Sequence, residues 1–317
     1  LSTLNYTLGC SKWIWMQSRA FNNIIYYMEP HGAGFERSHQ NETEKSPIKI
    51  SAATEIGPRN SNNDVAVVEP YCIGVIDGSG DGAGVGEAAK KIQQIMVDGL
   101  RDRDFTSKNE CLVEVNSLLM DAQKACSDSQ QGACVSFGVP FSEGGKRRLL
   151  IVNAGDARAT IINGRGEVFQ TLDNNQGVRQ KVVNENGKLI LSATEADTEE
   201  AYKAQATMDR YSHGEGPKGI FGGKLNPDPE TSLRLQYRNK VIGEIGSADG
   251  APAIETYIFD ISEGDTVVFT TDGATQRIST TTMKDVISRG GATEMLKHKK
   301  VKNIPAHDNC TVVVASF

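Results

Sequence analysis

Two helix-like stretches follow one another between groups of short strand-like segments, and this order constrains the fold more than any other feature. Apolar residues recur every three or four positions in residues 85–100 and again in residues 112–125, which is typical of helices with one buried face. Strand-like segments flank this pair at residues 48–53, 65–68, 71–76, 134–139, 149–153, 158–162 and 167–171. The turn-like residues 142–145 predict a hairpin between the segments 134–139 and 149–153. Because the helices are paired and do not alternate with the strands, the order predicts an α+β fold.

The second half of the chain contains a long stretch with little periodicity. From about residue 192 to residue 255 the sequence includes the acidic segment 195–200 and the glycine-rich segment 214–223. We interpret this region as a surface insertion or flap, because long unpatterned connections inside compact domains are usually functional. Regular patterns return in the strand-like segments 255–259, 266–271 and 311–316 and in a helix near residues 283–287.

Residues 1–46 differ from the rest of the chain. They contain both tryptophans, Trp13 and Trp15, and they end in the polar stretch 31–46. We interpret them as an N-terminal extension with a linker, followed by one domain over residues 47–317. Two hypotheses stand for the extension: it packs on the main domain, or it binds a partner or directs targeting.

The composition limits the classes of partner. The chain has 317 residues, of which 38% are hydrophobic and 23% charged, as in an ordinary soluble globular protein. The formal net charge of -6 argues against nucleic acid as the main partner. No apolar stretch approaches the roughly 20 residues that a membrane span needs. We therefore expect neither nucleic acid nor a membrane as a partner. We also expect the protein to be a monomer.

The cysteines point to a reducing environment. All six are scattered along the chain, at Cys10, Cys72, Cys111, Cys126, Cys134 and Cys310. Some lie in apolar runs, which favours reduced core residues over a disulfide framework. The expected location is the cytoplasm, with delivery to an organelle or to another cell as the alternative.

Three aspartates stand at the ends of strand-like segments. Asp77-Gly78 follows the apolar run 71–76, Asp272-Gly273 follows the run 266–271, and Asp308-Asn309 opens the last strand. A glycine after a strand permits a sharp turn and a close approach of the backbone to a ligand. Carboxylates gathered in this way are typical ligands of hard divalent metal ions.

Other interpretations of the glycine-rich turn 77–84 fit the sequence poorly. A dinucleotide fingerprint needs a further strand that ends in an acidic residue, but a second helix follows here. A phosphate-binding P-loop ends in Gly-Lys-Ser/Thr, and a calcium loop needs a glutamate where this chain has Ala88. No cysteine has an arginine after five intervening residues, so the phosphate loop of a cysteine phosphatase is absent.

Two further motifs make the pattern more specific. Arg59 and the segment 62–64 precede the second strand, and the segment Gly155-Asp156-Ala157-Arg158 lies between two strands. With the three aspartate motifs, and in this order, they resemble the metal-dependent PP2C (PPM) family of serine/threonine protein phosphatases. The resemblance extends from about residue 48 to residue 317.

The resemblance implies a fold and a set of site residues. The fold is a sandwich of two antiparallel β-sheets flanked by helices, in α-β-β-α layers, with the metals at one end. Two Mg²⁺ or Mn²⁺ ions are implied, bridged by Asp77, with the Gly78 carbonyl on one ion and with Asp272 and Asp308 on the other. Arg59 matches the arginine that binds phosphate, a role suited to its planar guanidinium. Weaker candidates for metal binding are Asn63, Asp64 and Asp156.

The sequence departs from the family pattern at three positions. Asn63 stands where the family has a glutamate that serves the second metal, so that site has lost a charge. Ser79 stands where many members have a histidine that protonates the leaving group, a substitution common in bacterial members. Gln276 replaces an aspartate and makes a third metal site doubtful, although Asp156 is present. His307 and His213 are the candidates for a replacement acid, and Asn309 is expected to shape the turn that orients Asp308.

These motifs predict a hydrolase of phosphoserine and phosphothreonine in proteins, acting through a metal-activated water. Two alternatives remain open. One is cleavage of another phosphorus linkage, such as a nucleotidylated protein, because the flap region is atypical. The other is a catalytically weak member that acts as a binding module, which the changes at Asn63 and Ser79 favour.

Overall fold

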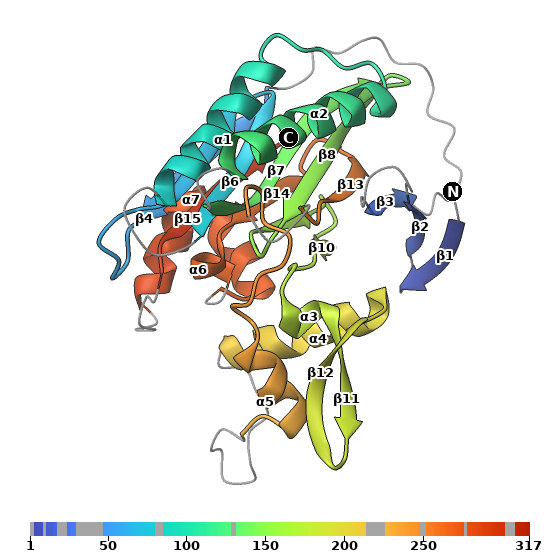
Figure 1. The fold of residues 1–317 in the computed structure, drawn as a ribbon. Coiled ribbons are helices and arrows are strands. Elements are labelled where there is room, and N and C mark those ends of the chain that lie inside the picture. The colour runs from blue at the N-terminus through green and yellow to red at the C-terminus, as the bar shows by residue number, and fades with distance from the viewer. Residues whose placement is uncertain are drawn as a thin grey trace.

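The computed structural model describes two packed sheets with helices on both outer faces (Figure 1). The residues described are 3–8, 11–17, 24–29, 47–79, 85–127, 131–213, 226–247, 252–275, 278–301 and 308–317.

The first sheet contains five antiparallel strands of the main domain. Their order across the sheet is β13 (Glu255–Asp260), β8 (Lys146–Ala154), β7 (Gly132–Glu143), β6 (Cys72–Ser79) and β5 (Asp64–Glu69). The hairpin predicted at residues 142–145 is confirmed, since Glu143 pairs with Lys146. Gly144 and Gly145 form its turn with φ angles of 60° and 77°, as a two-residue hairpin turn requires.

The second sheet also contains five antiparallel strands. Their order is β10 (Val168–Gln170), β9 (Arg158–Ile162), β14 (Thr266–Thr270), β15 (Cys310–Ser316) and β4 (Lys49–Glu55). Buried side chains from both sheets, such as Val75, Ile151 and Phe269, form one core between them. A sheet with an apolar face is stable only when that face is buried against another layer.

Helices cover the outer face of each sheet. α1 (Val85–Leu100) and α2 (Lys108–Ser127) share a core with the first sheet, and Figure 1 shows them together above β6 and β7. α6 (Asp272–Thr275) and α7 (Thr280–Val301) share a core with the second sheet. The predicted α-β-β-α sandwich is therefore confirmed, and so are the strands and the paired helices on which it was based.

The stretch that lacked periodicity in the sequence contains regular structure. Just before this stretch lie α3 (Gln176–Arg179) and a hairpin of β11 (Gln180–Glu185) and β12 (Lys188–Glu195), whose last residues enter it. The stretch itself contains α4 (Thr198–Ser212) and α5 (Pro229–Gln236). Figure 1 shows these elements projecting together below the sandwich. Capping aspartates at positions 197 and 228 accept hydrogen bonds from backbone amides three residues later. The sequence analysis did not use these capping aspartates, which could have indicated where both helices begin.

Three strands near the N-terminus extend the first sheet through backbone pairing. β1 (Thr3–Leu8), β2 (Ser11–Gln17) and β3 (Ile24–Glu29) pair antiparallel in sequence order. β3 then pairs parallel with β13. This pairing accords with the hypothesis that the extension packs on the main domain, while the polar stretch 31–46 lies outside the described residues.

Two further expectations concern membrane-spanning helices and the state of the cysteines. Within the described parts of the chain, no helix has both the length and the apolar character to cross a membrane. The five cysteines from Cys72 to Cys310 are free and buried, which agrees with their interpretation as core residues, and Cys10 lies outside the described residues.

Candidate metal and phosphate site

A pocket of about 280 Å³ opens at one end of the sandwich. Its lining consists of Arg59, Asn63, Asp77, Gly78, Ser79, Cys134, Asp156, Asn239, Val241, Glu244, Asp272 and Asp308. Residues from sequence positions as distant as 59 and 308 therefore meet in one place. Of the residues predicted to bind metal or phosphate, all of which the structure describes, only Asp64 is missing from this lining.

The strand ends bring the carboxylates together. Asp77 lies near the end of β6, between Asp64 on β5 and Cys134 on β7. In the other sheet, Asp272 follows β14 and Asp308 precedes the neighbouring strand β15. The two turns touch closely, because a Cβ atom on Gly273 would lie 1.9 Å from the Asn309 carbonyl oxygen. Only glycine allows this approach.

The electrostatics of the pocket require positive charge or bound protons. Burial, followed by the charges of neighbouring carboxylates, raises the pKa values of Asp77 and Asp156 well above the usual range. Burial and then Asp308 raise the pKa of Asp272 to about 6. Like charges held close together in a buried site favour the protonated form. A divalent cation would reverse this effect, because it stabilises the ionised carboxylates.

Asp64 lies behind the pocket and contacts its framework. Its Oδ2 accepts a hydrogen bond of 2.9 Å from the Thr271 hydroxyl, which itself accepts one from the Thr311 amide. Its buried Oδ1 has no hydrogen-bond partner among the described residues, and burial raises its pKa to about 6. The position suits a residue that supports Asp77 and Asp272 from behind, outside the lining of the pocket.

Asn309 fastens the loop that carries Arg59. Its side-chain amide donates to the carbonyl oxygens of Ile56 and Ser61, at 2.8 and 2.9 Å. Its Oδ1 accepts from the backbone amide of Asn63 at 2.9 Å. A buried amide with all these bonds made fixes the loop conformation. The expected turn-shaping role of Asn309 therefore includes holding the Arg59 loop against the start of β15.

Arg59 itself reaches an aspartate of the pocket. One of its terminal nitrogens lies 2.7 Å from Asp308 Oδ2, and its side chain remains 41% exposed. The guanidinium therefore stands at the pocket mouth, where it can meet an incoming anion. In this structure it also offsets part of the carboxylate charge.

Four lining residues were not predicted from the sequence: Cys134, Asn239, Val241 and Glu244. The last three belong to the segment after α5, where the sequence shows no strand or helix periodicity. The Ser79 hydroxyl donates a hydrogen bond of 2.8 Å to Glu244 Oε2. Cys134 lies opposite Asp77 in the β6–β7 register, which only the structure shows. No signal identified Glu244.

Of the two candidate histidines, only His213 lies in the part of the chain that the structure describes. His213 ends α4, and its Nε2 lies 2.7 Å from the Thr275 carbonyl oxygen. It is not among the residues that line the pocket. His307 and Gln276 both lie outside the described residues.

The donor set fits small, hard cations. Among the described residues, no three histidine, cysteine or acidic side chains are grouped so that they could hold a metal ion by themselves. Mg²⁺ usually keeps several water ligands and needs only one or two protein carboxylates. Oxygen ligands suit Mg²⁺ and Mn²⁺, whereas zinc sites are usually built from cysteine and histidine. An open pocket with clustered aspartates therefore fits hydrated Mg²⁺ or Mn²⁺ better than a caged metal.

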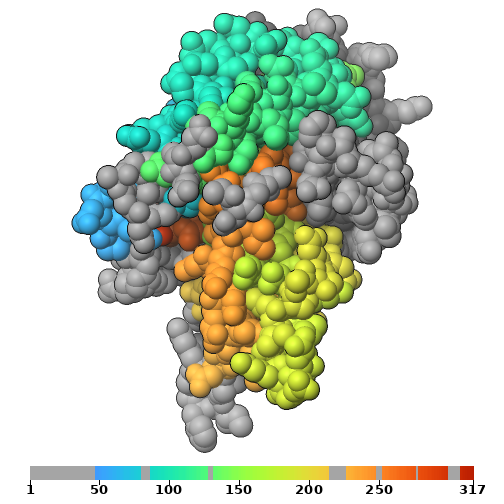
Figure 2. Space-filling model, viewed as in Figure 1, coloured from blue at the N-terminus to red at the C-terminus, as the bar shows by residue number. Residues whose placement is uncertain are grey.

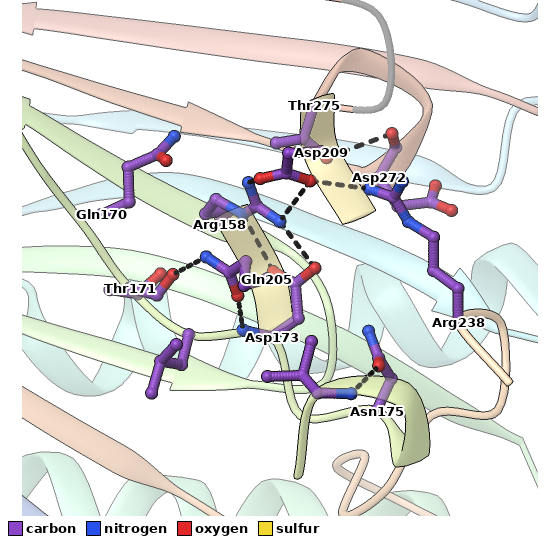
Figure 3. A network of polar contacts seen from close by, with 12 residues as sticks. Arg158, Gln170, Thr171, Asp173, Asn175, Gln205, Asp209, Arg238, Asp272 and Thr275 are labelled. Carbon is purple, nitrogen blue, oxygen red and sulfur yellow. Dashed lines mark hydrogen bonds and ion pairs between the residues drawn. The ribbon is translucent and has the colours of Figure 1, made fainter. Parts of the chain in front are cut away.

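A network of buried ion pairs holds the insertion against the sandwich (Figure 3). Arg158 on β9 forms two bonds to Asp173, at 2.9 and 2.7 Å, and a third to Asp209 on α4 at 2.6 Å. Asp209 also accepts a bond of 3.2 Å from Arg238. Figure 3 shows Arg238 extending beside Asp272. The network thus links the insertion to the floor of the pocket.

The raised pKa values predict how metal stabilisation depends on pH. A folded-state pKa of about 6 for Asp272, against a usual 3.8, means that the metal-free cluster contributes stability at low pH. That contribution is fully present below about pH 3.8 and is lost as the pH rises through about 6. Metal binding requires ionised carboxylates. We therefore expect Mn²⁺ to raise the melting temperature more at pH 7.5 than at pH 5.0, as measured by scanning calorimetry. Equal shifts at both pH values would contradict this account.

Comparisons with known proteins support the fold. No family model and no curated protein sequence matches the chain. Solved structures do match. Stp1, a serine/threonine phosphatase from Staphylococcus aureus, has a TM-score of 0.61 at 15% identity, covering 89% of this chain and 99% of that one. The Mycobacterium tuberculosis serine/threonine phosphatase PstP/Ppp has a TM-score of 0.59 at 16% identity, covering 85% and 98%.

A further match is the catalytic domain of PstP in complex with two manganese ions, with a TM-score of 0.54 at 14% identity, covering 85% and 97%. At these identities the matches establish the architecture. The chain therefore has the PP2C-like fold that its motifs predicted.

Proposed function

We propose that this protein is a metal-dependent phosphatase that hydrolyses phosphoserine and phosphothreonine in proteins. The observation that carries the proposal is the meeting of Asp77, Asp272, Asp308 and Arg59 in one open pocket. The phosphatases named above share the fold, and the two manganese ions of PstP support a two-ion site.

The site residues would divide two tasks between them. Asp77, the Gly78 carbonyl, Asp272 and Asp308 would hold two Mg²⁺ or Mn²⁺ ions. The ions, when bound, supply a water of lowered pKa and offset charge on the phosphoryl oxygens. Arg59 would bind two phosphoryl oxygens through its planar guanidinium and orient the phosphorus for in-line attack.

The supporting residues make this arrangement rigid. Asn309 holds the Arg59 loop through hydrogen bonds to residues 56, 61 and 63. Asp64 and Thr271 tie the ends of the two sheets together. Fixed positions of this kind matter because misplacement by about 1 Å costs on the order of a hundredfold in rate. Asn63 lines the pocket without adding a carboxylate, so we expect the second ion to be held weakly.

Three purified substrates distinguish the candidate functions. With Mn²⁺ present, we expect phosphate release from phosphoserine and phosphothreonine peptides, and loss of that release with EDTA. Nucleotide release from a nucleotidylated protein, with no phosphate release from the peptides, would favour the second candidate linkage. Phosphopeptide binding without any turnover would favour the binding module.

Arg59→Ala tests the phosphate contact. We expect KM for a phosphoserine peptide to rise roughly tenfold to a hundredfold, since a hydrogen bond to a charged group contributes about 1.5–3 kcal/mol. Arg59→Lys keeps the charge but loses the paired geometry, so its KM should lie in between. Mn²⁺ affinity, measured by calorimetry, should change far less than KM. A collapse of Mn²⁺ affinity would instead show that Arg59 serves the metal site through Asp308.

A further inference from the structure

One wall of the pocket comes from the insertion, and its backbone is pinned to the sandwich. We call residues 239–246 the insertion wall. The Ile245 and Ala133 backbones exchange two hydrogen bonds of 2.9 and 3.0 Å. The Ile242 amide donates to the Asn174 carbonyl at 2.7 Å, and the Gly246 amide donates to Gln123 at 2.6 Å. These bonds make the wall a fixed surface, although the region resembled a flap in the sequence.

The ion network fixes the other end of the wall. Arg238, which directly precedes it, binds Asp209 at 3.2 Å and contacts the Ser212 hydroxyl. Asp209 is held in turn by the fully buried Arg158. Figure 2 shows the orange surface of this part of the chain between helices α1 and α2 above and the β11–β12 hairpin below. The wall is therefore anchored at both of its ends.

Glu244 places a carboxylate on this wall at a defined position. Its Oε2 accepts the Ser79 hydroxyl at 2.8 Å, and its Oε1 lies 3.8 Å from the Cys134 sulfur. A Cβ atom on Gly132 would lie 2.5 Å from Oε2. The carboxylate is therefore held close over the adjoining ends of β6 and β7, and it lines the same pocket as Arg59 and Asp77.

The net charge of the pocket indicates which charge a substrate should carry beside its phosphorylated residue. Among the described lining side chains, five are carboxylates and Arg59 is the one cation. Two divalent ions with Arg59 carry as much positive charge as the five carboxylates carry negative charge. A bound phosphate dianion therefore leaves the pocket negative. Complementary charge on a substrate increases both selectivity and association rate.

We propose that Glu244 is a specificity-determining residue that selects phosphoproteins with a lysine or arginine next to the phosphorylated residue. The proposal rests on the proposed phosphatase function. The carboxylate would accept hydrogen bonds from the basic side chain while Arg59 and the metal side of the pocket hold the phosphate. Carboxylates accept several hydrogen bonds at once, so the Ser79 contact is compatible with this role. Because the wall is fixed, the carboxylate need not be ordered when substrate binds.

The test compares two phosphoserine peptides of equal length. One has arginines at both flanks of the phosphoserine, and the other has glutamines there. For the unchanged protein with Mn²⁺ we expect kcat/KM to be at least about fivefold higher for the arginine peptide, as one charged hydrogen bond allows. In Glu244→Gln this ratio should fall towards one, mainly through KM. Raising the salt concentration should weaken the preference of the unchanged protein.

Glu199→Gln is the matched control. It removes the same charge from an exposed position in the first turn of α4, in the same insertion, and it should keep the peptide preference. An equal fall for both peptides in Glu244→Gln, with the ratio kept, would overturn the proposal in favour of a structural role. A marked loss of Mn²⁺ affinity in calorimetry would overturn it in favour of a metal-binding role. If the unchanged protein hydrolyses neither peptide, the phosphatase function itself fails.

Discussion

Replacing Asp77 with asparagine is expected to reduce Mn²⁺-dependent phosphate release by at least about a hundredfold, a typical loss for one preorganised electrostatic group. Asp272→Asn should act in the same way. Both aspartates line the pocket at strand ends, and an amide cannot neutralise a divalent ion. The measurement is phosphate release from a phosphoserine peptide across a Mn²⁺ titration.

The same substitutions should leave the fold intact. Burial and neighbouring carboxylates raise the pKa of Asp77, so removal of its charge relieves repulsion in the metal-free protein. We expect the melting temperature without metal to stay equal or rise, and the stabilisation by Mn²⁺ to shrink. Asp121→Asn, at an exposed position on α2, is the control and should keep full activity. Full activity in Asp77→Asn and Asp272→Asn would exclude the two-ion site.

Replacing Arg158 with methionine is expected to lower the free energy of unfolding by about 3–5 kcal/mol, because removing one partner of a buried ion pair leaves uncompensated charge. The side chain of Arg158 is 1% exposed and binds both Asp173 and Asp209. Burial alone would raise the pKa of Asp209, but Arg158 and Arg238 more than reverse this and hold it below its usual value. Urea unfolding of both proteins measures the difference.

Two further variants make this prediction specific. Arg165→Met breaks an ion pair in which the side chains are 75% and 62% exposed, and such pairs contribute less than about 1 kcal/mol. Adding Asp173→Asn to Arg158→Met should recover part of the lost stability, because one of the orphaned charges is removed. A cost below about 1 kcal/mol for Arg158→Met would show that water or rearrangement compensates the two aspartates.

Local patterns in the chain were enough to predict the layered architecture. The periodicity of residues 85–100 and 112–125 predicted two helices with one buried face, and both cover the first sheet. The strand segments and the Gly144-Gly145 turn were also predictable from the sequence. The alternation of apolar and polar residues and the residue types of a turn are properties of neighbouring residues. The helices of the insertion were missed, since their signal lay in two capping aspartates instead of a strong apolar pattern.

The candidate site was predictable only where its residues stand in motifs. Asp77, Asp272 and Asp308 each follow or open a strand next to a glycine or an asparagine, and these positions meet at one end of the sandwich. The family resemblance implied Asp64 as a weaker candidate for metal binding. The structure places it behind the lining because its β5 position pairs it with Asp77 inside the sheet.

The sequence by itself determined the order of elements, their buried faces and the chemistry available at the strand ends, because these depend on residues within a few positions of one another. Only the tertiary structure decided that Glu244 joins the pocket. Its place depends on the Ala133–Ile245 pairing and on the buried Arg158–Asp209–Arg238 network, contacts between residues about 30 to more than 100 positions apart. Such long-range contacts leave no periodic trace in a single sequence, since each is formed by the packing of whole elements.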